Sequence, residues 1–133
     1  MSAARPMACA VVLGLAVACR PPEPTATGSA RIVSQVVFAD EELWHLGPDV
    51  RPRVVGVSPM ADDPRYSDAV GLWPAELPRP TGAEAIAAQN PDLVVIAEFT
   101  ADETRALLEQ MGVRTLRLEG WDGFADVRRH IRE

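Results

Sequence analysis

The segment TGAEAIAAQNPDLVVIAEFTADETRALLEQMGVRTLRLE, residues 81–119, decides the fold class of this chain. Its apolar pattern predicts a helix, a strand, a second helix and a second strand. The run LVVIA is continuously apolar, as expected of a strand that is covered on both faces. The spacings Thr81 to Glu84 and Thr100 to Glu103 predict a capping box at the start of each helix. Strands that alternate with helices favour a parallel sheet with right-handed crossovers.

The residues before this segment extend the same pattern. RIVSQVVF and RVVGV are rich in β-branched residues and predict two more buried strands, with the short helix ADEELWHLG between them. Its acidic residues suit the positive end of the helix dipole, and Gly47 is a natural stop. Residues 58–80 have no clear periodicity and predict a long irregular segment. We expect an α/β fold with an open parallel four-stranded sheet, strands near 31–37, 53–57, 93–97 and 114–118, and helices on both faces.

Two helical faces in the second half carry specific expectations. In DETRALLEQM we expect Leu107, Leu108 and Met111 to point inward. The sequence DGFADVRRHIRE predicts a last helix with Phe124, Val127 and Ile131 on one side, because residues three or four apart share a helical face. We expect part of that apolar side to stay uncovered.

The amino terminus has the pattern of an export signal. One Arg is followed by an apolar run from Met7 to Ala18, which is too short to span a membrane and has the length of a signal-peptide core. Ala16-Val17-Ala18-Cys19 resembles a lipobox, although Leu is usual where Ala16 stands. This predicts a signal peptide at 1–18, a lipidated Cys19 with a Pro-rich tether over 19–30, and a domain at 31–133. The alternative is an ordinary secretory signal cleaved near Ala18. Cys9 would be lost with the leader, so no disulfide pair is expected.

Charge and motifs exclude several functions. The formal net charge of −6 argues against nucleic acid as the main partner. The chain lacks the glycine-rich dinucleotide fingerprint, the Walker loop and the nucleophile elbow. His45 and His130 have no second ligand at metal spacing, so no metal site and no catalytic residue is predicted. The remaining polar and aromatic candidates have structural explanations: a turn for Asp62-Asp63, a helix start for Asp40-Glu41-Glu42, and core packing for Trp44 and Trp73.

The expected ligand site lies beyond the carboxyl ends of the strands, where ligands of open parallel sheets bind. The segments that follow the four strands are 36–40, 58–63, 98–100 and 120–122. Trp121 is the aromatic residue best placed to line a pocket there. The candidate ligand contacts are Val37, Phe38, Ser58, Met60, Glu98, Phe99 and Trp121.

Taken together, these segments resemble the amino-terminal lobe of bacterial ABC-transporter solute-binding proteins of the cobalamin, haem and iron-siderophore type. The resemblance covers about residues 31–133. It lies in RIVSQVVFADEELWHLG, RVVGVSPMADDPRYSDAVG, AEAIAAQNPDLVVIAEFT and ALLEQMGVRTLRLE, in that order and spacing. It departs from the family in the turn Gln35-Val36-Val37-Phe38, where many relatives carry small residues and a Pro.

The resemblance implies a binding protein with no enzymatic activity and no cofactor. Its ligand would be a ferric siderophore, haem or a corrinoid, its partner an ABC permease, and its location the cell envelope, with a lipid anchor in the membrane. Glu84 matches the position that docks Arg residues of the permease; a capping box with Thr81 is the structural alternative. The family's second lobe and linking helix have no counterpart here, so the chain is expected to be incomplete as a receptor.

Two readings from other classes stay open. One is a small secreted doubly wound enzyme that uses the Asp62-Asp63 loop and Glu98. It lacks a nucleophile and base pair in the sequence. The other is a lipoprotein interaction module without a small ligand.

Overall fold

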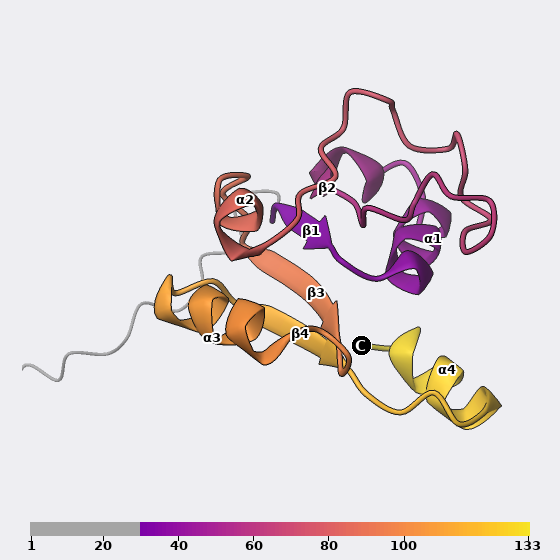
Figure 1. Ribbon diagram of the computed structural model, residues 1–133. Coiled ribbons are helices and arrows are strands. Elements are labelled where there is room, and N and C mark those ends of the chain that lie inside the picture. Colours follow the sequence, from indigo (N-terminus) through magenta and orange to yellow (C-terminus); the bar gives the residue numbers. More distant parts are fainter. Residues whose placement is uncertain (1–29) are drawn as a thin grey trace, which may run out of the picture.

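The computed structural model describes residues 30–133 (Figure 1). The signal peptide, Cys19 and nearly all of the tether predicted from sequence lie outside the described residues. Within residues 30–133, no helix is long and apolar enough to cross a bilayer.

The four predicted strands form one parallel sheet. They are β1 (Ile32–Ser34), β2 (Val54–Gly56), β3 (Leu93–Ala97) and β4 (Thr115–Leu118), in the spatial order β2-β1-β3-β4. Every neighbouring pair is parallel. The expected fold class is therefore confirmed.

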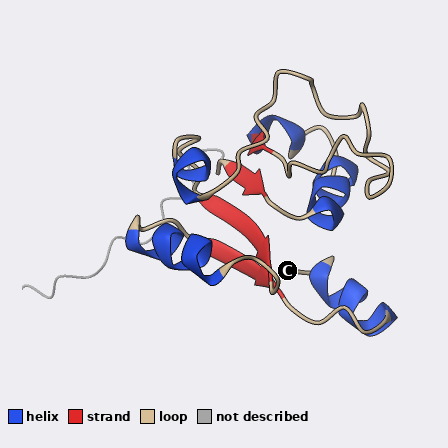
Figure 2. Cartoon of the chain, viewed as in Figure 1, coloured by secondary structure: helices blue, strands red, loops and turns tan. Residues whose placement is uncertain are grey.

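Helices cover both faces of the sheet (Figures 1 and 2). They are α1 (Val37–His45), α2 (Ala83–Ala87), α3 (Asp102–Gln110) and α4 (Phe124–His130), with a short 3-10 turn, η1 (Arg51–Arg53), before β2. Successive strand side chains point to opposite faces. Val33, Val94 and Ile96 therefore pack with α2 and α3, while Ile32 and Val95 pack with α1 and residues 58–80.

The first strand is shorter than the sequence predicts. β1 ends at Ser34 and α1 already begins at Val37, so Val37 and Phe38 are helical and not part of the strand. The Ser34 hydroxyl explains this change. It donates to the Val36 carbonyl at 3.0 Å and accepts from the Val36 amide at 3.3 Å. Such a local side-chain bond competes with the sheet ladder and turns the chain out of it.

Both predicted capping boxes are wrong. The N-cap of α2 is Gly82, with φ +81°, and that of α3 is Ala101; neither helix has a side-chain cap. The Thr100 hydroxyl instead accepts a hydrogen bond from the Ala97 amide at 3.2 Å, so it closes the turn after β3. The spacing of Thr100 and Glu103 in the sequence did not reveal that the Thr100 hydroxyl would bond within the turn after β3 instead of capping α3.

The α3 face is less buried than the sequence predicts, whereas the apolar side of α4 is partly uncovered, as expected. In α3 only Leu108 is fully buried, and Leu107 and Met111 are exposed. In α4 Phe124 is 88% exposed and Ile131 is 52% exposed. The residue of α4 that packs inward is His130.

Residues 58–80 form neither a helix nor a strand (Figure 2), although several of their side chains are buried. We call them the 58–80 segment. Successive turns follow one another, and the segment buries Ala61, Ala69 and Trp73 against α1 and the sheet. Trp73 meets Trp44 edge to face at 5.1 Å between ring centroids. The sequence predicted that this segment would be irregular. It did not predict that Ala61, Ala69 and Trp73 would be part of the core, because that depends on tertiary packing.

Candidate ligand-binding site

A pocket lies at the edge of the sheet where the strands end. The strand order reverses between β1 and β3, since β2 lies on one side of β1 while β3 and β4 lie on the other. This is the place where ligands of open parallel sheets bind. The pocket, here called the carboxyl-edge pocket, has a volume of about 340 Å³. It is lined by Gln35, Val36, Val37, Phe38, Ser58, Pro59, Met60, Tyr66, Phe99 and Trp121.

All but one of the ligand contacts predicted from sequence line this pocket. The exception is Glu98, which the structure does not bring into it. Its carboxylate accepts a hydrogen bond from the Gly120 amide at 3.0 Å. Glu98 lies instead in an open polar hollow beside Arg117 and Arg129. It holds the turn after β4, where Gly120 adopts a φ of +74° that favours glycine.

The pocket lining also includes two residues that the sequence analysis missed, Gln35 and Tyr66, of which Tyr66 comes from the middle of the 58–80 segment. Val36 and Pro59, which complete the walls, lie in the segments 36–40 and 58–63 that the sequence placed at this edge. No periodicity pointed to Tyr66. The one available signal was compositional, since it is the only Tyr in the chain and stands in a long irregular segment.

The pocket surface is mainly aromatic and apolar. Phe38 and Trp121 meet edge to face with ring centroids 5.6 Å apart. Phe99 is 72% exposed, and Met60 and Tyr66 are also more than half exposed. Large apolar side chains that stay exposed around one concavity mark a binding surface.

A buried carboxyl holds the base of the pocket. Both carboxyl oxygens of Asp40, in α1, lie 3.2 Å from the Ser58 amide nitrogen. Burial raises the pKa of Asp40 to about 6, and the groups of Ser58 and Ser34 offset this only in part. The Ser58 hydroxyl is buried and has no hydrogen-bond partner within residues 30–133. It lies close enough to the Asp40 carboxyl to lower the pKa of that group.

Behind the pocket, α4 is attached through aromatic contacts. His130 lies 4.3 Å from Trp121 and 6.0 Å from Phe38, measured between ring centroids. Its Nε2 is 3.0 Å from the Glu119 carbonyl oxygen, which fixes that nitrogen as the protonated one if the imidazole is neutral. The sequence assigned His130 to the surface or the core, and it is in the core, whereas His45 is exposed.

The acidic pair Asp62-Asp63 is used for structure. Asp63 accepts from the Arg65 amide at 3.0 Å, which is the Asx-type turn that the sequence predicts. Asp62 forms an ion pair with Arg79 at 2.8 Å. Over residues 30–133, no three His, Cys, Asp or Glu side chains gather closely enough to hold a metal ion.

Glu84 is exposed in the first turn of α2. The capping box that offered a structural reason for this residue does not form. α2 packs on the face of the sheet opposite to α1.

Comparison with known proteins supports the fold. No family model matches the chain, and no curated protein matches it. Solved structures do match, and those described below are periplasmic haem-binding proteins. The chain has the fold of one lobe of such solute-binding proteins, as the resemblance in sequence predicted.

Three solved structures illustrate the likeness. RhuT from Roseiflexus sp. RS-1, in its apo form, is 31% identical with a TM-score of 0.52, over 69% of this chain and 34% of RhuT. BhuT in complex with two haems is 21% identical with a TM-score of 0.58, over 79% of this chain and 42% of BhuT. A haem-binding protein from Pseudomonas aeruginosa is 24% identical with a TM-score of 0.56, over 73% and 34%. The chain thus spans well under half the length of these proteins.

Proposed function

We propose that residues 31–133 form the haem-binding lobe of a cell-envelope receptor that delivers its ligand to an ABC importer. The observation that carries the proposal is the carboxyl-edge pocket, which is aromatic, apolar and open, in a fold shared with periplasmic haem-binding proteins. Among the ligands considered from sequence, haem fits best because a flat macrocycle can stack on Phe38, Phe99 and Trp121.

The size and openness of the pocket suggest that this lobe holds one side of the ligand. A volume of about 340 Å³ is at the lower end of the usual range for ligand pockets, about 300–1,000 Å³. The matched proteins are much longer than the matched part. The proposal therefore includes a second lobe that closes over the exposed rings of Phe99 and Tyr66.

Tyr66 is the residue of the pocket best suited to contact the iron. Tyrosine is one of the side chains that bind haem iron in proteins. Among residues 30–133, no His lines this pocket, and Tyr66 supplies its one phenol oxygen. We propose that the Tyr66 oxygen ligates ferric iron while the neighbouring aromatic rings contact the macrocycle.

Absorbance titration of the purified chain with haem tests this function. Phe38→Ala and Trp121→Ala should each weaken haem binding by about ten- to hundredfold, as loss of a central aromatic contact does. Tyr66→Phe should keep the ring but change the absorbance spectrum of bound ferric haem. Leu107→Ala, an exposed apolar residue on α3, is the matched control and should change neither.

Competition decides among the ligand classes. Cobalamin or a ferric siderophore that displaces haem at lower concentration would replace haem in the proposal. Haem binding that survives all three pocket substitutions would place the ligand elsewhere and contradict it.

Membrane attachment and transport complete the proposed role. Cys19 is the proposed lipidation site, and mass spectrometry of membrane-extracted protein should find an acylated Cys19 as the first residue. A mature chain that starts elsewhere would contradict this.

Glu84, exposed on α2, is the proposed permease contact, and Glu84→Arg should reduce uptake without changing haem affinity.

The enzyme alternative has less support. Asp62 and Asp63 are paired with Arg79 and Arg65, and the Glu98 carboxylate holds the Gly120 amide. These three carboxylates therefore do not meet in one site. The structures that match the chain are named as binding proteins.

A further inference from the structure

The 58–80 segment builds one wall of the carboxyl-edge pocket without any regular secondary structure. It contributes Ser58, Pro59, Met60 and Tyr66 to the lining. Backbone hydrogen bonds close the individual turns of this wall, and contacts with side chains fix how the turns lie against one another. Three hydrogen-bonded contacts that involve side chains join the segment to α1. The Ser58 amide lies 3.2 Å from both Asp40 carboxyl oxygens, the Asp68 amide donates to Glu41 at 2.8 Å, and the Trp73 indole donates to the Asp40 carbonyl at 3.2 Å.

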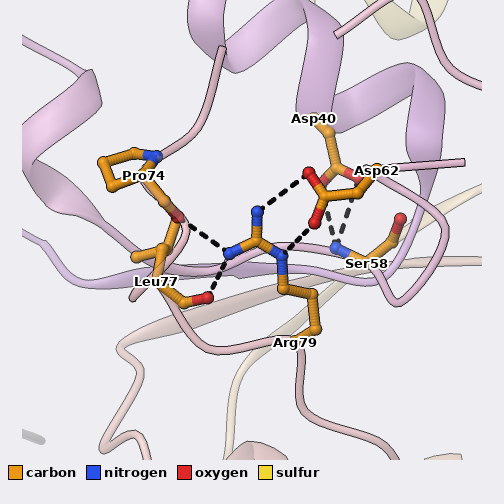
Figure 3. Close-up of polar contacts among 6 residues, drawn as sticks. All are labelled: Asp40, Ser58, Asp62, Pro74, Leu77 and Arg79. Carbon is orange, nitrogen blue, oxygen red and sulfur yellow. Dashed lines mark hydrogen bonds and ion pairs between the residues drawn. The ribbon is translucent and has the colours of Figure 1, made fainter. Parts of the chain in front are cut away.

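Within the segment, the Arg79 guanidinium connects two separate turns, the one that holds Asp62 and the one that runs from Pro74 to Leu77 (Figure 3). Arg79 donates to both carboxylate oxygens of Asp62, at 2.8 and 3.1 Å. It also donates to the carbonyl of Pro74 at 2.9 Å and to that of Leu77. The Arg79 side chain is 17% exposed and does not line the pocket. These bonds bring the beginning of the segment, before Tyr66, against its end.

The chemistry of this contact requires arginine. Arg carries five donors in a rigid fork, whereas Lys carries a compact ammonium that cannot hold a carboxylate and two carbonyls in fixed directions. The ion pair alone is worth little, since Asp62 is half exposed. The larger effect is geometric, because removal of Arg79 breaks the side-chain link between the Asp62 turn and the Pro74–Leu77 turn, while the Val57 amide still holds the Pro78 carbonyl.

We propose that Arg79 is a positioning residue that holds the pocket wall in its ligand-binding shape, acting on the ligand through Met60 and Tyr66. The expected effect of Arg79 on haem affinity rests on the proposed function, whereas its effect on the shape of the pocket wall does not. Ligand affinity falls when a site must be ordered at the moment of binding, so preorganisation by Arg79 raises affinity without a direct contact.

The test compares Arg79→Ala and Arg79→Lys with Arg31→Ala. Arg31 is a matched control because its guanidinium also donates to two backbone carbonyls, those of Gln89 at 2.7 Å and Asn90 at 3.0 Å, and it is not part of the pocket. Both Arg79 variants should bind haem about tenfold more weakly than the unmodified chain, and Lys should not rescue. Arg31→Ala should keep the haem affinity, even where it lowers the melting temperature.

A double variant separates positioning from general destabilisation. If Arg79 acts through Tyr66, Arg79→Ala should have little further effect on haem binding in a Tyr66→Phe background, whereas independent effects would add. Full additivity, or an equal loss of affinity in Arg31→Ala, would overturn the inference.

Hydrogen exchange gives a readout that does not depend on haem. Arg79→Ala should speed exchange of the backbone amides in residues 60–67, while Arg31→Ala should not. Unchanged exchange there would overturn the role of Arg79 even if haem binds. Faster exchange in a chain that binds no haem would support the role of Arg79 and contradict the proposed function instead.

Discussion

The 58–80 segment and α4 form opposite cases of how local regularity relates to packing. The segment has no helix or strand, yet Ala61, Ala69 and Trp73 are almost fully buried. The helix α4 is regular, yet Phe124 and Ile131 are exposed and its inward contact is made by His130. In this protein, the side chains that a segment buries in the core determine how firmly it is held to the sheet. Regular backbone hydrogen bonding, as in α4, does not by itself produce such burial.

The largest expected effect comes from removing the main core contact of the 58–80 segment. Trp73→Ala should lower the free energy of unfolding by about 3–5 kcal/mol, because it deletes a buried aromatic ring and leaves a cavity against Trp44. Urea denaturation measures this loss. A loss below 1 kcal/mol would mean that the segment is not part of the cooperative core, and the contrast with α4 would disappear.

The second prediction concerns Asp40, which joins α1 to the base of the segment. Its pKa is about 6 in the folded protein against 3.8 for the free side chain, so folding favours the protonated form. The stabilisation is fully present below pH 3.8 and is lost as the pH rises through about 6. Two pKa units correspond to about 3 kcal/mol, taken as an upper value for a group that keeps hydrogen bonds in its ionised form.

Denaturation at several pH values between 4.5 and 7.5 measures this effect. Asp40→Asn cannot ionise, and its stability should be nearly flat over the same interval. The neighbouring Glu41, with the same charge, contributes to the raised pKa, and Glu41→Gln should shift the transition slightly to lower pH. Parallel pH curves for the unmodified chain and Asp40→Asn would contradict the assignment.

The third prediction loosens α4. His130→Ala removes the contacts with Trp121 and the Glu119 carbonyl, and should destabilise the protein by about 1–2 kcal/mol. Hydrogen exchange should show faster opening of residues 124–131, with β1 and β3 protected as before. If the whole domain opened together, α4 would be as firmly integrated as the 58–80 segment.

The smallest effect is expected at Phe124. Phe124→Ala should change the free energy of unfolding by less than about 0.5 kcal/mol, because the ring is 88% exposed and loses little contact with water on folding. The same aromatic-to-alanine change at Trp73 is the direct comparison. A loss at Phe124 close to that at Trp73 would show that another surface covers α4 in solution.

The apolar runs were enough to predict the sheet, because a strand covered on both faces must be apolar throughout. All four strands were located, and the pairing is parallel as expected. The ends of elements were less predictable. The Ser34 hydroxyl ended β1 early and Thr100 closed a turn, since each hydroxyl had a local backbone partner that competes with the regular pattern.

The site was only partly predictable for a related reason. Phe38, Phe99 and Trp121 come within four residues of the ends of β1, β3 and β4, and the ends of parallel strands lie at one edge of the sheet. Glu98 follows a strand too, but its side chain turned to the Gly120 amide. Tyr66 reached the pocket along an irregular path that no periodicity describes.

The sequence by itself determined the α/β class, the four strands and the edge at which a ligand site would form, because these follow from apolar periodicity and chain direction. Only the tertiary structure decided the path of the 58–80 segment, the burial of Asp40 and the closure made by Arg79. The physical reason is range. Periodicity is set by residues a few positions apart, whereas the pKa of Asp40 and the fork of Arg79 depend on partners up to 18 residues away that meet only in the folded chain.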